Sequence, residues 1–269
     1  MKLNEARRAL TARLAAVTDE AAYEADLIME HATGRKKAEL LFSEDELLPE
    51  EAEAIDAAAK RREAHEPLQY ILGRWGFMGL EFYTRPGALI PRQDTETLAE
   101  HAVCIIRERG YKTALDICTG TGCIAVSLAV LTDADVEASD ISPLCAELAR
   151  QNAEANSVSL RVRTADLFSG AGSYDIITAN PPYLSVGDMA RLQTELEFEP
   201  ALALLGGPDG LDYYRRIAAE AGQHINPGGA LVLEVGAGQA EAVRGMFPGL
   251  KASLIPDLNG IDRAVEIDF

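Results

Sequence analysis

The segment Asn180-Pro181-Pro182-Tyr183 combines a side-chain amide, two rigid prolines and an aromatic ring. It directly follows the apolar run 174–179, which is typical of a buried strand that ends where prolines can no longer donate to a ladder. In open α/β sheets, ligands bind at the carboxyl ends of the strands. We expect the side-chain oxygen of Asn180 and the carbonyl of Pro181 to accept both hydrogens of a planar NH2 group, with Tyr183 against its face. An ordinary Asn-Pro turn is the alternative, and the position after a strand favours chemistry on an amide or exocyclic amine nitrogen.

A second group of residues has the pattern of a nucleotide-binding loop. Residues 115–125 form an apolar strand, a Gly-rich turn and a helix start, in which Gly120, Gly122 and Ala125 match G-x-G-x-x-[G/A]. Glycine lets a ligand approach the backbone, and the helix start offers free N–H groups. Asp140 lies at the end of the next predicted strand, where a carboxylate binds the ribose hydroxyls of an adenosine cofactor. NAD enzymes and S-adenosylmethionine (AdoMet) enzymes share this pattern, and a purely structural strand-to-helix turn also fits it.

The two motifs together narrow the chemistry. An adenosine site after the first strand of the sheet and an amine clamp after the fourth would place a cofactor beside an NH2 group. Hydride transfer has no use for such a clamp, whereas methyl transfer to nitrogen does. The sequence therefore favours AdoMet over NAD.

The elements that must position these motifs alternate between strands and helices. Strands are predicted at 114–117, 136–139, 160–164, 175–179 and 230–235, with weaker ones near 251–255 and 264–267; helices are predicted around 124–130, 143–156, 211–223 and 239–246. This alternation predicts an α/β fold with a doubly wound sheet.

The first 75 residues differ from the rest, because their apolar residues recur at helical spacing. Asp19 is predicted to cap a second helix that Gly34 ends, and Pro49 to begin a long helix through about Glu63. Residues 76–92 suggest a hairpin linker, after which Asp94 or Thr95 is predicted to cap a helix. We expect a helical substrate-docking domain at 1–75, the linker at 76–92 and a catalytic domain at 93–269.

Composition restricts the partners. The chain has 269 residues and a formal charge of −18, which argues against duplex DNA as the main substrate because nonspecific binders need basic residues for phosphate contacts. We find no signal-peptide pattern and no apolar run of membrane-spanning length. The four cysteines lack paired spacing, so we expect reduced thiols in a cytoplasmic protein, with no metal site. We also expect a monomer without direct nucleic-acid or membrane contacts.

Several further segments carry a resemblance to a known family. They are residues 66–73 (EPLQYILG), 89–96 (LIPRQDTE), 199–200 (EP), 207–211 (GPDGL), 227–229 (PGG) and 233–236 (LEVG). With the two motifs above, they make the whole chain similar to the PrmC/HemK family of AdoMet-dependent protein-(glutamine-N5) methyltransferases. The junction at 89–96 is the most specific of them, because generic amino-methyltransferases lack it.

The resemblance implies a seven-stranded catalytic lobe, an N-terminal helical lobe that presents the substrate, and methylation of the glutamine in the Gly-Gly-Gln motif of peptide chain release factors. The amide-binding and catalytic residues would be Asn180, Pro181 and Tyr183, with Pro182 also at the substrate. Residues contributing to the cofactor site would be Cys118, Thr119, Gly120, Thr121, Gly122, Asp140, Leu167 and Asn180, with Asp166 beside Leu167 at the adenine. Arg92 and Glu96 would close the site or form a surface ion pair, and Asp116 would order the loop.

Three positions depart from the pattern of the family. Cys118 and Cys123 stand where relatives often carry Gly and Ala, and Gln93 stands where Pro is common. Because Gly120 and Gly122 remain, we expect cofactor binding to be retained, with Cys118 slightly crowding the carboxylate end of the ligand.

Two other functions stay open on the sequence alone. An adenine-N6 methyltransferase acting on DNA or RNA would use the same clamp on a flipped base. A non-catalytic AdoMet-binding protein that docks on a partner would keep the cofactor loop, although it would not need the clamp.

Overall fold

The computed structural model describes residues 1–42 and 45–269, which form two compact units. The first unit contains Met1–Gly73 together with Gln193–Phe198, and the second contains Arg74–Leu192 and Glu199–Phe269. The division after Gly73 lies close to the boundary predicted at residue 75. The inclusion of Gln193–Phe198 in the helical unit has no signal in the sequence.

The helical unit is built from short amphipathic helices. They are α1 (Leu3–Leu14), α2 (Ala21–Thr33), α3 (Lys37–Phe42), α4 (Pro49–Glu63), α5 (Leu68–Leu72) and the 3-10 segment η1 (Thr194–Phe198). Helix α1 buries Leu3, Ala6, Leu10 and Leu14 at helical spacing. Gly34 ends α2 in the left-handed conformation, as predicted, but Asp19 does not cap this helix, because Glu20 occupies the cap position.

A buried arginine ties η1 to the helices of this unit. Arg62 on α4 is 3% exposed and pairs with Glu24 at 2.7 Å and with Glu195 at 2.6 Å. A buried guanidinium needs such partners, because an unpaired buried charge is strongly unfavourable.

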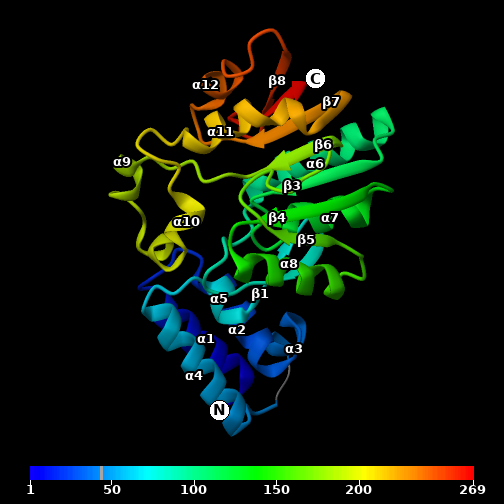
Figure 1. The fold of residues 1–269 in the computed structure, drawn as a ribbon. Helices are drawn as coiled ribbons and strands as arrows, with labels where there is room; N and C mark the ends of the chain where they lie inside the picture. The colour runs from blue at the N-terminus through cyan, green and yellow to red at the C-terminus, as the bar shows by residue number, and fades with distance from the viewer. Residues whose placement is uncertain (43–44) are drawn as a thin grey trace. The chain divides into compact units, whose positions relative to one another are not determined.

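The second unit begins with a hairpin at residues 74–83, which covers only part of the linker predicted at 76–92 and belongs to this unit, and it continues into a seven-stranded sheet. The hairpin strands are β1 (Arg74–Phe77) and β2 (Leu80–Tyr83), and the sheet strands are β3 (Thr113–Ile117), β4 (Asp135–Asp140), β5 (Arg161–Thr164), β6 (Tyr174–Ala179), β7 (Ile225–Glu234), β8 (Lys251–Pro256) and β9 (Asp262–Asp268). The order is β5-β4-β3-β6-β7-β9-β8, with β9 antiparallel to its neighbours and the other pairs parallel (Figure 1). The predicted doubly wound fold is confirmed.

Helices cover both faces of this sheet. On one face, α6 (Gln93–Arg109), α7 (Cys123–Leu131) and α8 (Pro143–Ala155) pack over strand residues such as Ala114 and Ile176. On the other face, α11 (Asp212–Glu220) and α12 (Ala240–Arg244) pack over Leu115 and Ile177. The alternation of neighbouring residues between the two faces follows from the pleat of a strand.

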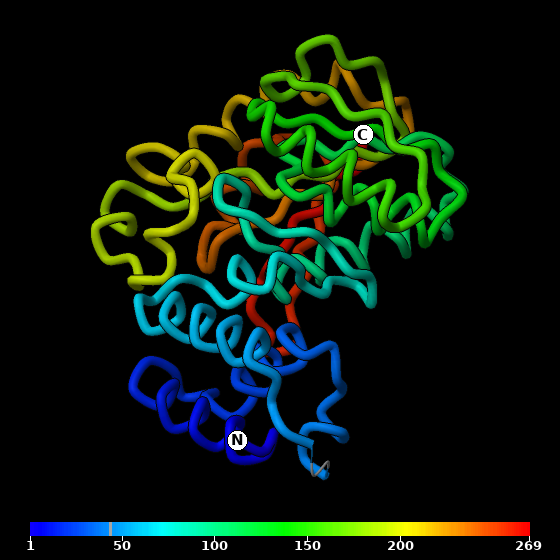
Figure 2. The backbone as a smooth tube through the Cα atoms, turned by 90° about the horizontal axis from the view of Figure 1, so that it is seen from below, coloured from blue at the N-terminus to red at the C-terminus, as the bar shows by residue number. Residues whose placement is uncertain are grey.

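A long excursion of the chain separates β6 from α11. It contains α9 (Val186–Met189) and α10 (Ala201–Leu204), which lie outside the layers of sheet and helices in both views (Figures 1 and 2). Among the described residues, no helix has both the length and the apolar character needed to cross a membrane.

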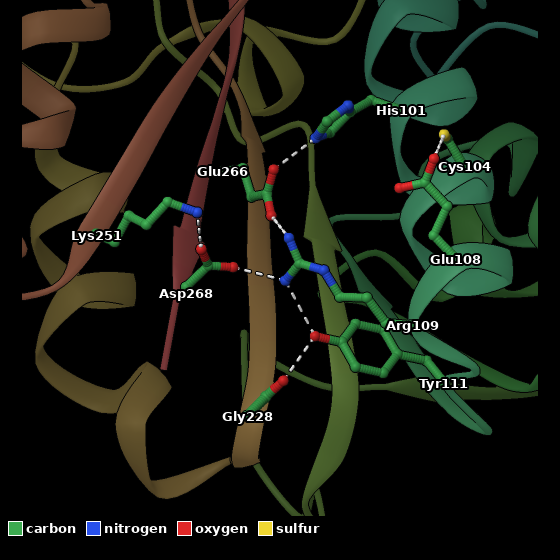
Figure 3. Close-up of polar contacts among 9 residues, drawn as sticks. All are labelled: His101, Cys104, Glu108, Arg109, Tyr111, Gly228, Lys251, Glu266 and Asp268. Atoms are coloured by element: carbon green, nitrogen blue, oxygen red, sulfur yellow. Dashed lines mark hydrogen bonds and ion pairs between the residues drawn. The ribbon is translucent and has the colours of Figure 1, made fainter.

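The amino end of the sheet is held by a network of charged groups (Figure 3). Arg109, in the last turn of α6, pairs with Glu266 and, at 2.6 Å, with Asp268 on β9. Lys251 pairs with Asp268 at 2.9 Å, and His101 contacts Glu266 at 2.8 Å. These contacts fix the carboxyl end of α6 to β8 and β9.

Candidate active site

A pocket opens at the carboxyl ends of β3, β4 and β6. This is the point where the strand order reverses, the usual ligand position in a doubly wound sheet. Of the site residues predicted from the sequence, it is lined by Arg92, Cys118, Thr119, Gly120, Thr121, Asp140, Asp166, Leu167, Asn180 and Pro182. Gly122, Pro181 and Tyr183 lie beside it without contributing to its lining.

The two loop glycines have different roles. Gly120 has a φ of 57°, and a Cβ added there would meet nothing within 4 Å, so the backbone leaves room for a ligand. Gly122 has a φ of 82°, and its Cβ would lie 2.9 Å from the Cβ of Ala149 on α8. Gly122 thus permits the close approach of α7 and α8, which explains why it does not line the pocket.

Asp140 organises the opposite wall. Its Oδ2 atom accepts a hydrogen bond from the Gly120 backbone N–H at 2.9 Å, and Oδ1 accepts one from Ser142 at 2.8 Å. Burial raises the pKa of Asp140, while these two hydrogen bonds lower it. Each carboxylate oxygen keeps a further lone pair, so the group can also accept hydroxyl hydrogens from a ligand.

Asp116, near the carboxyl end of β3, fixes the start of the loop. It accepts hydrogen bonds from the hydroxyls of Thr119 at 2.5 Å and Thr178 at 2.8 Å. The residue is fully buried, and burial raises its pKa to about 7 against the effect of these bonds. The geometry agrees with the ordering role expected for Asp116.

Two non-glycine residues on the pocket wall have left-handed backbones. Cys118 has a φ of 58° and Leu167 a φ of 46°. Glycine adopts this conformation readily and Asn or Asp tolerate it, but it is unfavourable for other residues. Residues held in unfavourable backbone conformations concentrate at functional sites. At Cys118, the positive φ is one that glycine would adopt without strain.

The pocket thiols are poor nucleophiles. Burial raises the pKa of all three thiols: above its usual value at Cys118, to about 12 at Cys123 and to about 11 at Cys145. All three line the pocket as protonated groups at neutral pH, so we assign them to packing.

Asn180 presents its amide with a defined orientation. Its Nδ2 atom donates to the Thr95 hydroxyl at 3.3 Å, and no described residue donates to its Oδ1 atom. Thr95 is 2% exposed and lies in the first turn of α6, which begins at Gln93 with Arg92 as the cap residue. The predicted capping role of Asp94 or Thr95 is therefore wrong, and Thr95 instead supports the site.

The backbone that follows Asn180 is held from outside the pocket. Pro181 and Pro182 are buried, and the Tyr183 carbonyl accepts a hydrogen bond from Gln239 at 2.9 Å. Burial raises the pKa of Tyr183 to about 12, so its hydroxyl is neutral.

Glycines of the segment 206–210 allow a close approach to this backbone. A Cβ at Gly206 would lie 2.5 Å from the Pro182 carbonyl oxygen, and a Cβ at Gly210 would lie 2.3 Å from that of Tyr183. Only glycine fits at these two positions, which gives the segment GGPDG a physical function in shaping the site.

Arg92 and Glu96, predicted together, are separated by the structure. Arg92 lines the pocket and pairs with the buried carboxylate of Glu199, which also accepts the backbone N–H of Ile90 at 3.1 Å. Glu96 accepts the backbone N–H of Met78 at 2.6 Å, where it supports the hairpin.

Comparison with known proteins agrees with this arrangement. A family model described as the PrmC N-terminal domain matches residues 5–73, and one described as the methyltransferase small domain matches residues 94–205. The release factor glutamine methyltransferase of Geobacter sulfurreducens is 42% identical over 92% of this chain and 89% of its own length. That of Cereibacter sphaeroides is 42% identical over 98% of both chains. This chain belongs to the release factor glutamine methyltransferase family.

Solved structures share the fold of this family member at lower identity. A methyltransferase from Pyrococcus furiosus has a TM-score of 0.54 and 20% identity, covering 72% of this chain and 90% of its own. The catalytic domain of human Mettl16 has a TM-score of 0.56 and 16% identity, covering 81% of this chain and 80% of its own. These likenesses establish the α/β methyltransferase fold.

The residues present fit AdoMet, the methyl donor of this family. The open space above Gly120 suits the amino-acid end of the ligand, and the acceptor oxygens of Asp140 suit a ribose. Apolar groups at Ile141 and Leu167 suit the adenine.

Several pocket residues of this family member were not identified from the sequence. Ile141, Leu202 and Tyr213 line the pocket, and Ile141 is 48% exposed although it is large and apolar. Its position directly after Asp140 is a signal that sequence reading could have used. Leu202 belongs to the excursion after β6, where no periodicity marks its role.

Proposed function

We propose that the protein transfers the methyl group of AdoMet to the side-chain amide nitrogen (N5) of the glutamine in the Gly-Gly-Gln motif of peptide chain release factors. Membership of the family supports the reaction and the class of substrate. The observation that carries the proposal is Asn180, whose oriented amide lies on the same pocket as the loop at Gly120.

The chemical difficulty of this reaction lies in the nucleophile. The lone pair of an amide nitrogen is delocalised into its carbonyl, so the nitrogen attacks only when positioned and when its developing positive charge is stabilised. Asn180 Oδ1 and the Pro181 carbonyl would accept its two hydrogens and orient it toward the methyl donor. Tyr183 would pack behind this clamp, since its half-buried ring lies against Gly236.

When bound, AdoMet supplies a methyl group activated by its sulfonium. We assign its amino-acid end to Cys118 through Thr121, its ribose to Asp140 and its adenine to the region of Leu167. Gly122 contributes through helix packing. Thr119 is held by Asp116, so the loop is ordered before the ligand arrives.

The remaining parts of the proposal concern partners. The helical unit is assigned to presentation of the release factor, and the reaction to the cytoplasm, where a monomer would act without direct nucleic-acid contacts. The acidic balance of the chain supports a protein substrate rather than a nucleic acid.

Mass spectrometry of a purified release factor after incubation with enzyme and AdoMet tests the proposal. We expect the mass of one added methylene on the glutamine of the Gly-Gly-Gln loop. A release factor with that glutamine replaced by glutamate provides the control and should stay unmodified. Label on DNA or RNA instead would support the adenine alternative, and no transfer to any acceptor would support the non-catalytic one.

A further inference from the structure

A buried carboxylate lies behind the clamp without full pairing. Glu234 ends β7 and is 3% exposed. Its Oε2 atom is buried and has no hydrogen-bond partner among residues 1–42 and 45–269. A buried carboxylate left partly unpaired is unfavourable, so its presence at the carboxyl end of the sheet calls for a role.

Glu234 lies next to Asn180 across neighbouring strands, because the residues that precede them, Leu233 and Ala179, are paired in β7 and β6. Burial raises the pKa of Glu234 to about 7, and the neighbouring polar side chains of Thr95 and Asn180 work against this rise. Thr95 in turn accepts from Asn180 Nδ2 at 3.3 Å. The three side chains come from α6, β7 and the end of β6.

The Thr95 hydroxyl has a single hydrogen, so it can donate to only one acceptor at a time. A Thr95 hydroxyl that donates to the carboxylate keeps its lone pairs for Asn180 Nδ2. Without an acceptor at Glu234, the hydroxyl can rotate and donate to Asn180 Oδ1. The amide of Asn180 would then turn its NH2 group toward the pocket, where it would repel the NH2 of a substrate.

We propose that Glu234 is a positioning residue that fixes the amide orientation of Asn180 through Thr95, so that the Asn180 oxygen faces the methyl acceptor. This inference rests on the proposed function of Asn180 as the clamp. Ionised Glu234 accepts hydrogen bonds only, whereas protonated Glu234 can donate and weakens the bias. Turnover therefore rises with pH and levels off above the pKa of Glu234.

Other charged or titratable groups face Glu234. Asp94 on α6 and Arg263 on β9 form an ion pair at 3.0 Å, and both act on its carboxyl group. Tyr183, Tyr214 and Cys123 also sense its charge, but burial raises the pKa of each far above neutrality. Asp116 titrates near the same pH on β3, so the profile must be read as a difference between variants.

Steady-state methylation of a release factor tests the positioning role. Glu234→Leu removes the acceptor at similar volume, and we expect kcat to fall by about 10–100-fold with unchanged KM for the release factor and unchanged AdoMet affinity. Glu234→Gln keeps one acceptor oxygen, so kcat should be intermediate and the pH dependence due to Glu234 should disappear. Glu266→Gln, which alters a buried carboxylate on the neighbouring strand β9, is the matched control and should leave kcat and its profile unchanged. Wild-type kcat in Glu234→Leu would overturn the proposal.

A second measurement does not depend on the substrate. In protein labelled with 15N-asparagine, the side-chain resonance of Asn180, assigned by its loss in Asn180→Ala, should shift with a midpoint near the pKa of about 7. The shift should vanish in Glu234→Gln and persist in Glu266→Gln. A pH-independent resonance in the wild type would refute the inference even if the release factor is methylated. A titrating resonance in a protein that methylates nothing would refute the proposed function alone.

Discussion

The pKa values of buried carboxyl groups shift in opposite directions at the two ends of the central sheet. At the carboxyl end, burial raises the pKa of Asp116, Asp140 and Glu234 above the usual range. At the amino end, Asp268 is also subject to burial, but hydrogen bonds from Lys251 and Arg109 lower its pKa. Asp175 behaves similarly, since Asn226 and two backbone N–H groups outweigh its burial.

The difference separates a part of the sheet that binds a ligand from a part that holds the fold together. The carboxyl end also contains the left-handed backbones of Cys118 and Leu167 and the unpaired Oε2 of Glu234. Unfavourable conformations and raised pKa values gather where a ligand can use them. At the amino end, the charged side chains pair with one another instead.

The largest effect is expected for Asn180→Ala. Turnover should fall by about 10²–10³-fold, the range seen when one preorganised hydrogen-bonding group is removed from an active site. AdoMet affinity should fall only modestly, because the Gly120 loop and Asp140 are untouched. Kinetics of release-factor methylation measure the turnover, and calorimetry measures the affinity for AdoMet. Unchanged turnover would exclude Asn180 from the clamp.

Asp116→Asn tests whether a buried carboxylate at the carboxyl end of the sheet lowers the stability of the protein at neutral pH. Between about pH 4 and 7 folded Asp116 keeps a proton that the unfolded chain has lost, so its contribution to the unfolding free energy falls as pH rises and levels off above 7. The shift of about three pKa units corresponds to roughly 4 kcal/mol at most. Urea unfolding of Asp116→Asn should show a shallower decline over this range.

Asp268→Asn provides the contrast from the amino end. Because the folded pKa of Asp268 is lowered, its contribution is present near neutrality and is lost as pH falls through that pKa. The variant should be less stable than wild type at pH 7 and approach it in acid. A decline with rising pH in both variants, equal to that of wild type, would contradict the proposed division of the sheet.

Asp140→Ala should weaken AdoMet binding by about 10–100-fold, since hydrogen bonds to a charged group contribute about 1.5–3 kcal/mol each. It also frees the N–H groups of Gly120 and Ser142, so the loop loses order. Asp140→Asn keeps one acceptor oxygen and should lose less. Calorimetry measures both, and an unchanged dissociation constant in Asp140→Ala would remove its proposed role.

The strands and the larger helices were predictable from local sequence. Each of the seven predicted strands is present, because β-branched apolar runs bounded by Gly, Pro or Asp specify a strand by themselves. The excursion that contains α9 and α10 was not predicted, since its short helices have no apolar periodicity. Its conformation depends on distant contacts, such as the hydrogen bond from the Leu184 backbone to Leu204 at 2.8 Å.

The site was predictable where a motif combines with a strand end. Gly120, Asp140 and Asn180 meet in one pocket because the carboxyl ends of β3, β4 and β6 lie side by side. The role inferred for Glu234 could not be read from the segment LEVG, because it depends on the neighbouring strand and on α6. Local rules even assign Thr95 to a helix cap, whereas packing turns it toward Asn180.

A smaller effect is expected at the amino end from Arg109→Met. The variant loses the pairs with Glu266 and Asp268 and leaves two carboxylates with fewer partners. Because the Arg109 side chain is 32% exposed, solvent screens the loss, and we expect about 1–2 kcal/mol of destabilisation. Turnover at a temperature where the variant is folded should match wild type.

Lys251→Met is the matched and smallest change. Lys251 meets the same Asp268, but its side chain is 75% exposed, so its removal should alter the unfolding free energy by no more than about 0.5 kcal/mol. Both variants remove one cation from Asp268, but Arg109 is less exposed and also pairs with Glu266, so the Arg109→Met effect should be the larger one. Chemical unfolding at low and high salt decides the matter: the Lys251 effect should vanish in salt while most of the Arg109 effect remains. If either variant instead lowers kcat without loss of stability, the amino end contributes to the reaction and the contrast between the two ends of the sheet fails.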